Sequence, residues 1–94
     1  MTMKYKIERT SRFKKDYKLI QKRGYDIKLL ETVVGILARG EILPAKYKDH
    51  PLKGMYRGLR ECHITPDWLL VYEIDDNMLY LYLTRTGMHS DLLE

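Results

Sequence analysis

Three histidines, His50, His63 and His89, are the side chains of this sequence best suited to proton transfer near neutral pH. An imidazole titrates close to pH 7, so a set of two or three supplies both a general base and a general acid. His63 stands near the end of one expected strand and Asp67 at the start of the next, so a short antiparallel connection would bring these two side chains together. A scattered histidine is more often a surface or hydrogen-bonding residue, and the sequence does not show whether the three converge.

Arg85 is a cation placed beside Thr86 and Gly87, where loop amides would help a guanidinium hold a phosphate by two contacts. A salt bridge to a nearby acid is the simpler role. RNA cleavage would use this set: a base takes the proton of a 2′-OH that attacks the adjacent phosphate, and an acid protonates the departing 5′-oxygen. A cation stabilises the crowded phosphorane. This scheme requires no metal and no cofactor, and composition permits it without selecting it.

The histidines with Asp67 also form a conceivable metal-ligand set. The histidines, at positions 50, 63 and 89, include no i, i+2 or i, i+4 pair of the kind that metal motifs use, so we expect no metal site. The single cysteine, Cys62, excludes an intramolecular disulfide and a Cys-rich zinc site. Cys62 and His63 are neighbours on an expected strand and point to opposite faces, which disfavours a Cys–His nucleophilic pair. We expect Cys62 in the core.

The elements that position these residues follow from the hydrophobic pattern. It predicts a strand over residues 3–8, a helix capped by Thr10 or Ser11 and running to about residue 23, and a second helix from the Asp26 cap to Gly40. A long loop covers residues 41–53. Strands follow over residues 56–64, 68–74 and 79–84, the second of them central and covered on both faces, and residues 85–94 form a short last segment. This β-α-α-β-β-β order predicts one α+β domain over residues 1–94, with a helical hairpin packed on one face of a largely antiparallel twisted sheet.

The charge is unevenly distributed along the chain. Residues 1–28 hold ten Lys/Arg and three acids, a net charge of +7, whereas residues 29–94 have a net charge of −3. The first helix carries a basic row that suits a nucleic-acid backbone, although a solvated face is the plainer interpretation. Its members are Lys14, Lys15, Lys18 and Lys22. The longest apolar run, residues 68–72, is too short to span a membrane, and the first residues lack a secretory apolar segment. The expected compartment is the reducing cytoplasm.

Four segments, KDHPLKG (48–54), GLRECHI (58–64), PDWLLVY (66–72) and RTGMHS (85–90), resemble YafQ-type toxins, a branch of the RelE/ParE toxin superfamily. The resemblance covers about residues 45–93 in order and at the family's spacing, and the layout of the N-terminal helical hairpin agrees with it. Each segment alone is a weak signal, whereas the four together are specific.

The resemblance implies a RelE-like fold and a ribosome-dependent mRNA endonuclease, the toxin of a bacterial type II toxin–antitoxin pair. Such a protein enters the ribosomal A site, contacts ribosomal RNA through basic surface, here the lysine row, and cuts the exposed codon. The active set carried over is His50, His63, Asp67 and His89, with Arg85 on the phosphate and Trp68 as an aromatic flanking the site. We expect His89 and His50 to transfer protons, and His63 and Asp67 to position the mRNA or tune the base. Leu93 stands where the family commonly has a phenylalanine that would contact the mRNA, which affects codon preference and rate more than the reaction class.

The resemblance also implies partners. These are a cognate antitoxin, acidic or disordered in the segment that wraps this basic chain, the ribosome with its mRNA, and operator DNA only through the antitoxin complex. Two other functions stay open from the sequence. One is a ParE-like inhibitor of DNA gyrase that does not catalyse, which would have no need of the histidines and Asp67. The other is an RNA- or ribosome-binding module without catalysis, which the charge asymmetry alone would support.

Overall fold

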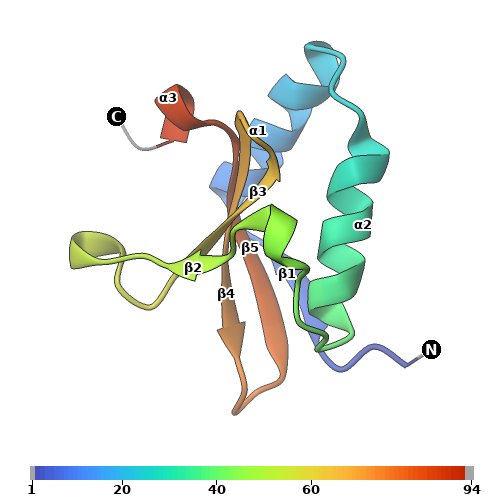
Figure 1. Ribbon diagram of the computed structural model, residues 1–94, viewed down its shortest axis with the longest axis vertical. Helices are drawn as coiled ribbons and strands as arrows, with labels where there is room; N and C mark the ends of the chain where they lie inside the picture. Colours follow the sequence, from blue (N-terminus) through green and yellow to red (C-terminus); the bar gives the residue numbers. More distant parts are fainter. Residues whose placement is uncertain (1, 93–94) are drawn as a thin grey trace.

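Figure 1 shows the computed structural model, which describes residues 2–92 apart from the side chain of residue 91. In chain order its elements are β1 (Lys6–Arg9), α1 (Ser11–Lys22), α2 (Ile27–Ala38), the 3-10 turn η1 (Ala45–Tyr47), β2 (His50–Pro51), the 3-10 turn η2 (Gly54–Tyr56), β3 (Arg60–Thr65), β4 (Trp68–Asp75), β5 (Tyr80–Met88) and α3 (His89–Leu92). Within the described residues, five strands form one sheet in the order β1-β5-β4-β3-β2. β1 runs parallel to β5, and the other three pairings are antiparallel. The predicted α+β class and helical hairpin are confirmed.

Both helices of the hairpin begin at the predicted caps. The Thr10 side chain accepts a hydrogen bond from the Phe13 amide at 3.0 Å, and the Asp26 carboxylate accepts one from the Lys28 amide at 3.1 Å. The Thr10 hydroxyl also donates to the Thr84 carbonyl at 2.8 Å, which ties the start of α1 to β5. Between the helices Gly24 has φ +78°, the left-handed conformation that lets the chain reverse at once.

The main core lies between the hairpin and one face of the sheet. It contains the apolar faces of α1 and α2 and the inward side chains of β3, β4 and β5, with Cys62 fully buried as predicted. A second, smaller cluster lies on the other face, where Leu92 of α3 packs with Leu69 and Val71 of β4. β4 is therefore a central strand covered on both faces, as the apolar run predicts.

The first strand begins later than predicted. β1 starts at Lys6, because the amides of Lys4 and Tyr5 both donate to the Ala38 carbonyl, at 2.9 Å, and are used at the end of α2. All four residues of β1 are exposed, as suits a short edge strand. β1 pairs in parallel with β5 and so forms one edge of the sheet.

Two other strand predictions extend too far. β3 begins at Arg60, because Gly54 and Gly58 have φ +68° and +98° and the chain there forms η2 and a turn. The predicted last strand begins at Leu79. This residue instead lies in the turn before β5 with φ +59°, and it is 46% exposed. The hairpin turn uses a residue in this conformation, so the strand begins one residue later than predicted.

The long loop and the last segment contain more regular structure than predicted. Residues 41–53 include η1 and the two-residue strand β2, which pairs with β3. The last strand continues to Met88 rather than ending at residue 84. Consequently His50 and Arg85, expected on loops, both lie on the sheet.

Candidate active site

Four side chains form one cross-strand row on the face of the sheet opposite the hairpin. His50 of β2 pairs with Glu61 of β3, Glu61 with Val71 of β4, and Val71 with Arg85 of β5. Directly paired residues in antiparallel strands point to the same face. Because Val71 packs in the smaller cluster with Leu92, this row belongs to the face that α1 and α2 leave uncovered.

The His50 ring is held at both nitrogens. Its Nδ1 lies 2.8 Å from the Lys48 carbonyl oxygen, and its Nε2 lies 3.3 Å from Oε1 of Glu61. Both neighbours are oxygens that accept hydrogen bonds, so the doubly protonated ring satisfies both contacts. The ring nevertheless stays exposed, with 46% of the side chain accessible.

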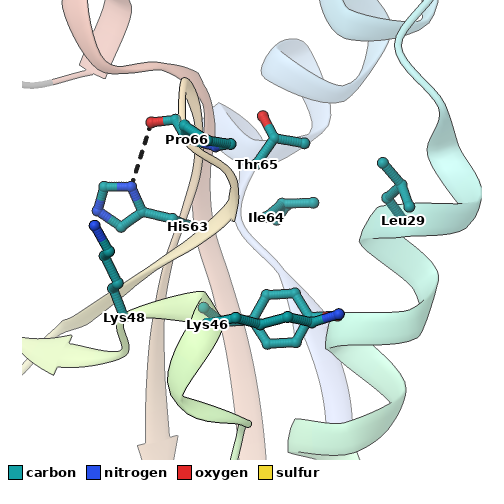
Figure 2. Close-up of a pocket in the computed structure, with 8 residues that line it drawn as sticks. Leu29, Lys46, Lys48, His63, Ile64, Thr65 and Pro66 are labelled. Carbon is teal, nitrogen blue, oxygen red and sulfur yellow. Dashed lines mark hydrogen bonds between the residues drawn. The ribbon is translucent and has the colours of Figure 1, made fainter.

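His63 lies beside His50. The two ring centroids are 6.3 Å apart, and the Nδ1 of His63 faces the Pro66 carbonyl oxygen at 3.4 Å, the dashed line in Figure 2. If Nδ1 donates to that carbonyl, Nε2 of His63 keeps an open lone pair. The structure thus brings together two of the three predicted histidines.

Glu61 belongs to the site although the sequence interpretation did not select it. Its side chain is buried, and within residues 2–92 its second oxygen, Oε2, has no hydrogen-bond partner. A buried carboxylate with an unpaired oxygen costs free energy, which is a feature of functional sites more than of packing. A signal for it was present in the sequence, because Glu61 and His63 are two residues apart on one strand and share a face.

Asp49 and Arg60 fix the loop that carries His50. The Arg60 guanidinium lies 3.1 Å from Asp49, whose other oxygen accepts a hydrogen bond from the Tyr72 hydroxyl. Burial, then the hydrogen bond to Asp49, raises the pKa of Tyr72, and the hydrogen bond to Asp49 raises the pKa of Arg60. These contacts anchor the residue next to His50 to β3 and β4.

A cavity of about 400 Å³ opens beside His63, between η1, β3 and α2. Figure 2 shows the cationic side chains of Lys46 and Lys48 at this cavity, with Leu29 of α2 on the far side. The ammonium end of Lys48 points toward the imidazole of His63. Lys46 instead lies over the Tyr47 ring, with Nζ 5.1 Å from the ring centroid.

Asp67 and His89 lie at the same end of the sheet as His63, because His63 pairs with Leu69 and Leu69 with Gly87, two residues before His89. Asp67 is exposed in the turn between β3 and β4, and within the described residues it makes neither a hydrogen bond nor an ion pair with His63. The hydrogen-bond partner of His63 in this turn is the Pro66 carbonyl, and the predicted closeness of His63 and Asp67 stays a prediction. His89 is exposed at the first position of α3, directly after β5.

Arg85 makes the salt bridge that is the simpler of its two predicted roles, although it lies on a strand rather than beside a loop. Arg85 lies inside β5 and makes a two-point ion pair with Asp16 of α1, with Nε 2.7 Å and Nη2 3.2 Å from its oxygens. The Thr86 amide, expected to face a phosphate, donates to Asp16 at 3.1 Å. α1 reaches this part of β5 because β1 ends at Arg9 and leaves it uncovered. Arg85 still lines a cavity of about 290 Å³ with Val71 and Leu92 on the open face.

Trp68, which the resemblance implies as an aromatic flanking the site and mRNA, is a core residue, the more usual role of a tryptophan that opens an apolar strand. It is 4% exposed, its Nε1 donates to the Thr86 hydroxyl at 2.8 Å, and its ring packs edge-on against Tyr25 with centroids 5.0 Å apart. The apolar face that would stack on a base is used in the core. Leu93 lies outside the described residues. The lysines of the basic row are all exposed on α1: Lys14, Lys15, Lys18 and Lys22.

Residues 2–92 contain neither a metal-binding cluster nor a membrane-spanning helix. No group of three or more His, Cys, Asp or Glu side chains there has the geometry to hold a metal ion. No helix in that part of the chain is long and apolar enough to cross a membrane.

Comparison with known proteins identifies the family. The family model described as "Bacterial toxin of type II toxin-antitoxin system, YafQ" matches residues 5–94. The mRNA interferase toxin YafQ of Escherichia coli K12 is 42% identical over 87 residues, which cover 92% of each chain. A metal-bound toxin from Helicobacter pylori superposes with a TM-score of 0.89 at 50% identity, covering 95% of this chain and 99% of that one. The toxin of the E. coli DinJ–YafQ complex superposes with a TM-score of 0.88 at 41% identity, covering 96% of this chain and 99% of that one. The predicted resemblance and fold are therefore confirmed, and the chain belongs to the YafQ family of bacterial type II toxin–antitoxin toxins.

Proposed function

We propose that this chain is the toxin of a toxin–antitoxin pair and cleaves mRNA on the ribosome. The observation that carries the proposal is the placement of His50 and His63, with ring centroids 6.3 Å apart, on the open face of the sheet that also carries Arg85. The family supports it, because a relative 42% identical to this chain is named an mRNA interferase. An inhibitor of DNA gyrase that does not catalyse would have no need of this histidine pair.

The reaction is a transesterification within the mRNA. The 2′-oxygen attacks the adjacent phosphorus while a base takes its proton, the P–O5′ bond breaks, and an acid protonates the departing 5′-oxygen. The products are a 2′,3′-cyclic phosphate and a 5′-OH. His63 suits the base, because its Nδ1 faces the Pro66 carbonyl and its Nε2 is open. His89, exposed at the start of α3, suits the acid.

His50 takes an electrostatic part in this scheme. The ring is held between the Lys48 carbonyl and Glu61, and in its doubly protonated form it places a positive charge on the open face, where the phosphate gains charge in the transition state. These roles revise the expectation from the sequence, which gave proton transfer to His50 and positioning to His63. Asp67, in the turn after His63, keeps its predicted part in positioning the mRNA.

The mechanism calls on no metal ion. A relative has been solved as a metal-bound toxin, so the point needs its own test. Cleavage by this chain should keep its rate in Mg²⁺ buffer containing a chelator selective for zinc and copper. A rate that falls with the chelator and returns with added metal would contradict metal independence.

The partners follow from the same proposal. A YafQ toxin has been solved with DinJ, and we expect this chain to bind its own antitoxin and to meet operator DNA only through that complex. We expect the lysine row of α1 to contact ribosomal RNA, because exposed cations of one sign attract a phosphate backbone. The site of action is the cytoplasm, where translating ribosomes are.

Mapping mRNA ends by primer extension in a translating extract, with and without ribosomes, tests the proposal. We expect cuts within translated codons only when ribosomes are present. His50→Ala, His63→Ala and His89→Ala should each lower the yield at least about tenfold, whereas Met78→Ala, exposed in the far β4–β5 turn, should not.

Three outcomes would overturn the proposal. Cleavage at the wild-type level by each histidine variant would refute the assignment of the active site to these histidines. DNA breaks with intact mRNA would favour gyrase inhibition. Ribosome binding with intact mRNA in every codon context would favour a binding module without catalysis.

A further inference from the structure

Lys48 has a backbone conformation that its side chain disfavours. It caps η1 with φ 49° and ψ 43°, the left-handed region that glycine adopts without strain and that costs free energy when a Cβ is present. Leu79 is the other described residue with a side chain and positive φ, and it serves a hairpin turn far from the site. A lysine at a position suited to glycine indicates that the side chain itself is used.

Both ends of Lys48 face the histidine pair. Its carbonyl oxygen is 2.8 Å from Nδ1 of His50, and its side chain lines the cavity of about 400 Å³ beside His63. In Figure 2 the ammonium end points toward the His63 ring. Lys48 is exposed, and within residues 2–92 it forms no ion pair. The strained backbone thus sets one histidine while presenting a cation to the other.

Arg85, the cation that the sequence selected for the phosphate, is differently placed. Its guanidinium makes a two-point contact with Asp16, and only 23% of the side chain is accessible. Moving it onto a substrate would leave the Asp16 carboxylate, which is 13% exposed, without that partner. A phosphate brought to His63 therefore meets the ammonium of Lys48 at no such cost.

We propose that Lys48 binds the reacting phosphate of the mRNA and stabilises it as it becomes a phosphorane. The proposal rests on the proposed mRNA cleavage and adds a residue to it. A base at His63 requires the 2′-OH beside that ring. The phosphate that the 2′-oxygen attacks is carried by the 3′-oxygen of the same ribose, so it would lie beside the cavity that His63 and Lys48 both line. Its oxygens gain negative charge during attack, so the ammonium binds the transition state more tightly than the ground state.

The cavity supplies a matched control for the test. Lys46 and Lys48 carry the same charge and line the same cavity, but Lys46 lies over Tyr47. Lys48→Met and Lys46→Met keep the chain length and remove one charge each. Single-turnover cleavage of mRNA on programmed ribosomes gives the rate constant at saturation, and ribosome affinity is measured separately.

We expect Lys48→Met to lower the rate constant about 100-fold or more, the usual cost of losing a transition-state donor, with ribosome affinity kept within about twofold. Lys46→Met should cleave at the wild-type rate, and Lys48→Arg should recover a large part of it. Lys48→Gly should show the same loss as Lys48→Met, yet its melting temperature should equal or exceed that of the wild type, because glycine relieves the left-handed strain. A variant that is inactive but not destabilised separates chemistry from folding.

Wild-type rates in Lys48→Met would refute the role of Lys48 and leave mRNA cleavage by the wild type intact. A loss confined to ribosome affinity would also refute it and place Lys48 on ribosomal RNA phosphates. Equal losses of the rate constant in Lys46→Met and Lys48→Met would also refute the specific role of Lys48, because any positive charge at the cavity would then have the same effect. Absence of cleavage by the wild type itself would overturn both this proposal and the proposed function.

Discussion

His50 and Glu61 face each other across β2 and β3, with Nε2 of the histidine 3.3 Å from Oε1 of the carboxylate. The carboxylate is 4% exposed, whereas the histidine ring is open to solvent. A buried charge that touches an exposed imidazole orients that ring from below. The contact thus links a buried residue of the sheet to an exposed residue on the face where the mRNA would bind.

Glu61→Gln should separate orientation from stability. The amide removes a buried charge with an unpaired oxygen, so the melting temperature should not fall. The His50 ring loses its anionic partner, and cleavage should drop about tenfold or more, the range seen when a carboxylate behind a functional histidine is removed. Thermal denaturation and single-turnover cleavage measure the two effects. The control is Glu73→Gln, exposed on β4, which should change neither the melting temperature nor the cleavage rate. A fully active Glu61→Gln would contradict the orienting role of Glu61.

Arg85 and Asp16 should show strong energetic coupling. A double-mutant cycle with Arg85→Met and Asp16→Asn should give an interaction energy of about 1–3 kcal/mol, because the contact is two-point and partly buried. The exposed pair of Arg39 and Glu41, at 3.2 Å, supplies the control and should give less than about 1 kcal/mol. Urea denaturation of the seven proteins in the two cycles, which share the wild type, provides the values. Equal interaction energies in the two cycles would show that burial does not strengthen the ion pair between Arg85 of β5 and Asp16 of α1.

Cys62 should make the fold sensitive to alkaline pH. Burial first, then the carboxylates of Asp49 and Glu61, raise the pKa of this thiol to about 12. The unfolded chain releases the proton near its ordinary value of 9, so the stability is present below pH 9 and is lost as the pH rises toward 12. The slope from this group is at most about 1.4 kcal/mol per pH unit.

Urea denaturation at pH 8 and at pH 10.5 checks the slope. Cys62→Ala removes the titrating group and should show a smaller difference between the two pH values. At pH 8 a thiol reagent should label the wild type only as fast as the protein unfolds. Rapid labelling of the folded protein would mean that the thiol is neither buried nor held protonated.

The basic row of α1 should govern ribosome association. Lys18→Gln together with Lys22→Gln should weaken binding to ribosomes and lower the slope of log affinity against log salt by about 1–2, because each lost phosphate contact releases fewer counterions. The control pair, Lys6→Gln with Lys28→Gln, has the same net charge and places the exposed changes on β1 and α2. Sedimentation with ribosomes at several salt concentrations measures both. The same slope in both pairs would indicate attraction by net charge rather than by this row.

Local signals in the sequence predicted the local structure well. The caps at Thr10 and Asp26 act over two or three residues, and the apolar run that begins at Trp68 needs only burial to become a central strand. The pairing of β1 with β5 joins residues more than 70 positions apart, and no short-range pattern encodes it. The same holds for Arg85, whose partner Asp16 is 69 residues away along the chain.

For the candidate site too, some residues could be predicted from the sequence and others depend on the three-dimensional structure. Residue types and the resemblance selected the three histidines, because imidazoles are few and stand in recognisable segments. The role of Glu61 depends on the register of β2 against β3, and that of Lys48 on a backbone angle. The burial of Trp68 depends on how the helices cover it, so a residue that the resemblance placed at the surface belongs to the core.

The parallel pairing of the first strand with the last strand also governs when this molecule matures during its own synthesis. A nascent chain that lacks residues 80–88 can form the helical hairpin but has no partner for β1 and no neighbour for one edge of β4. His89 and the cover from Leu92 arrive only with the last residues of the described chain. The order of synthesis therefore keeps the sheet incomplete until residues 80–88 have been made. A partner that recognises the complete sheet has no target before that point.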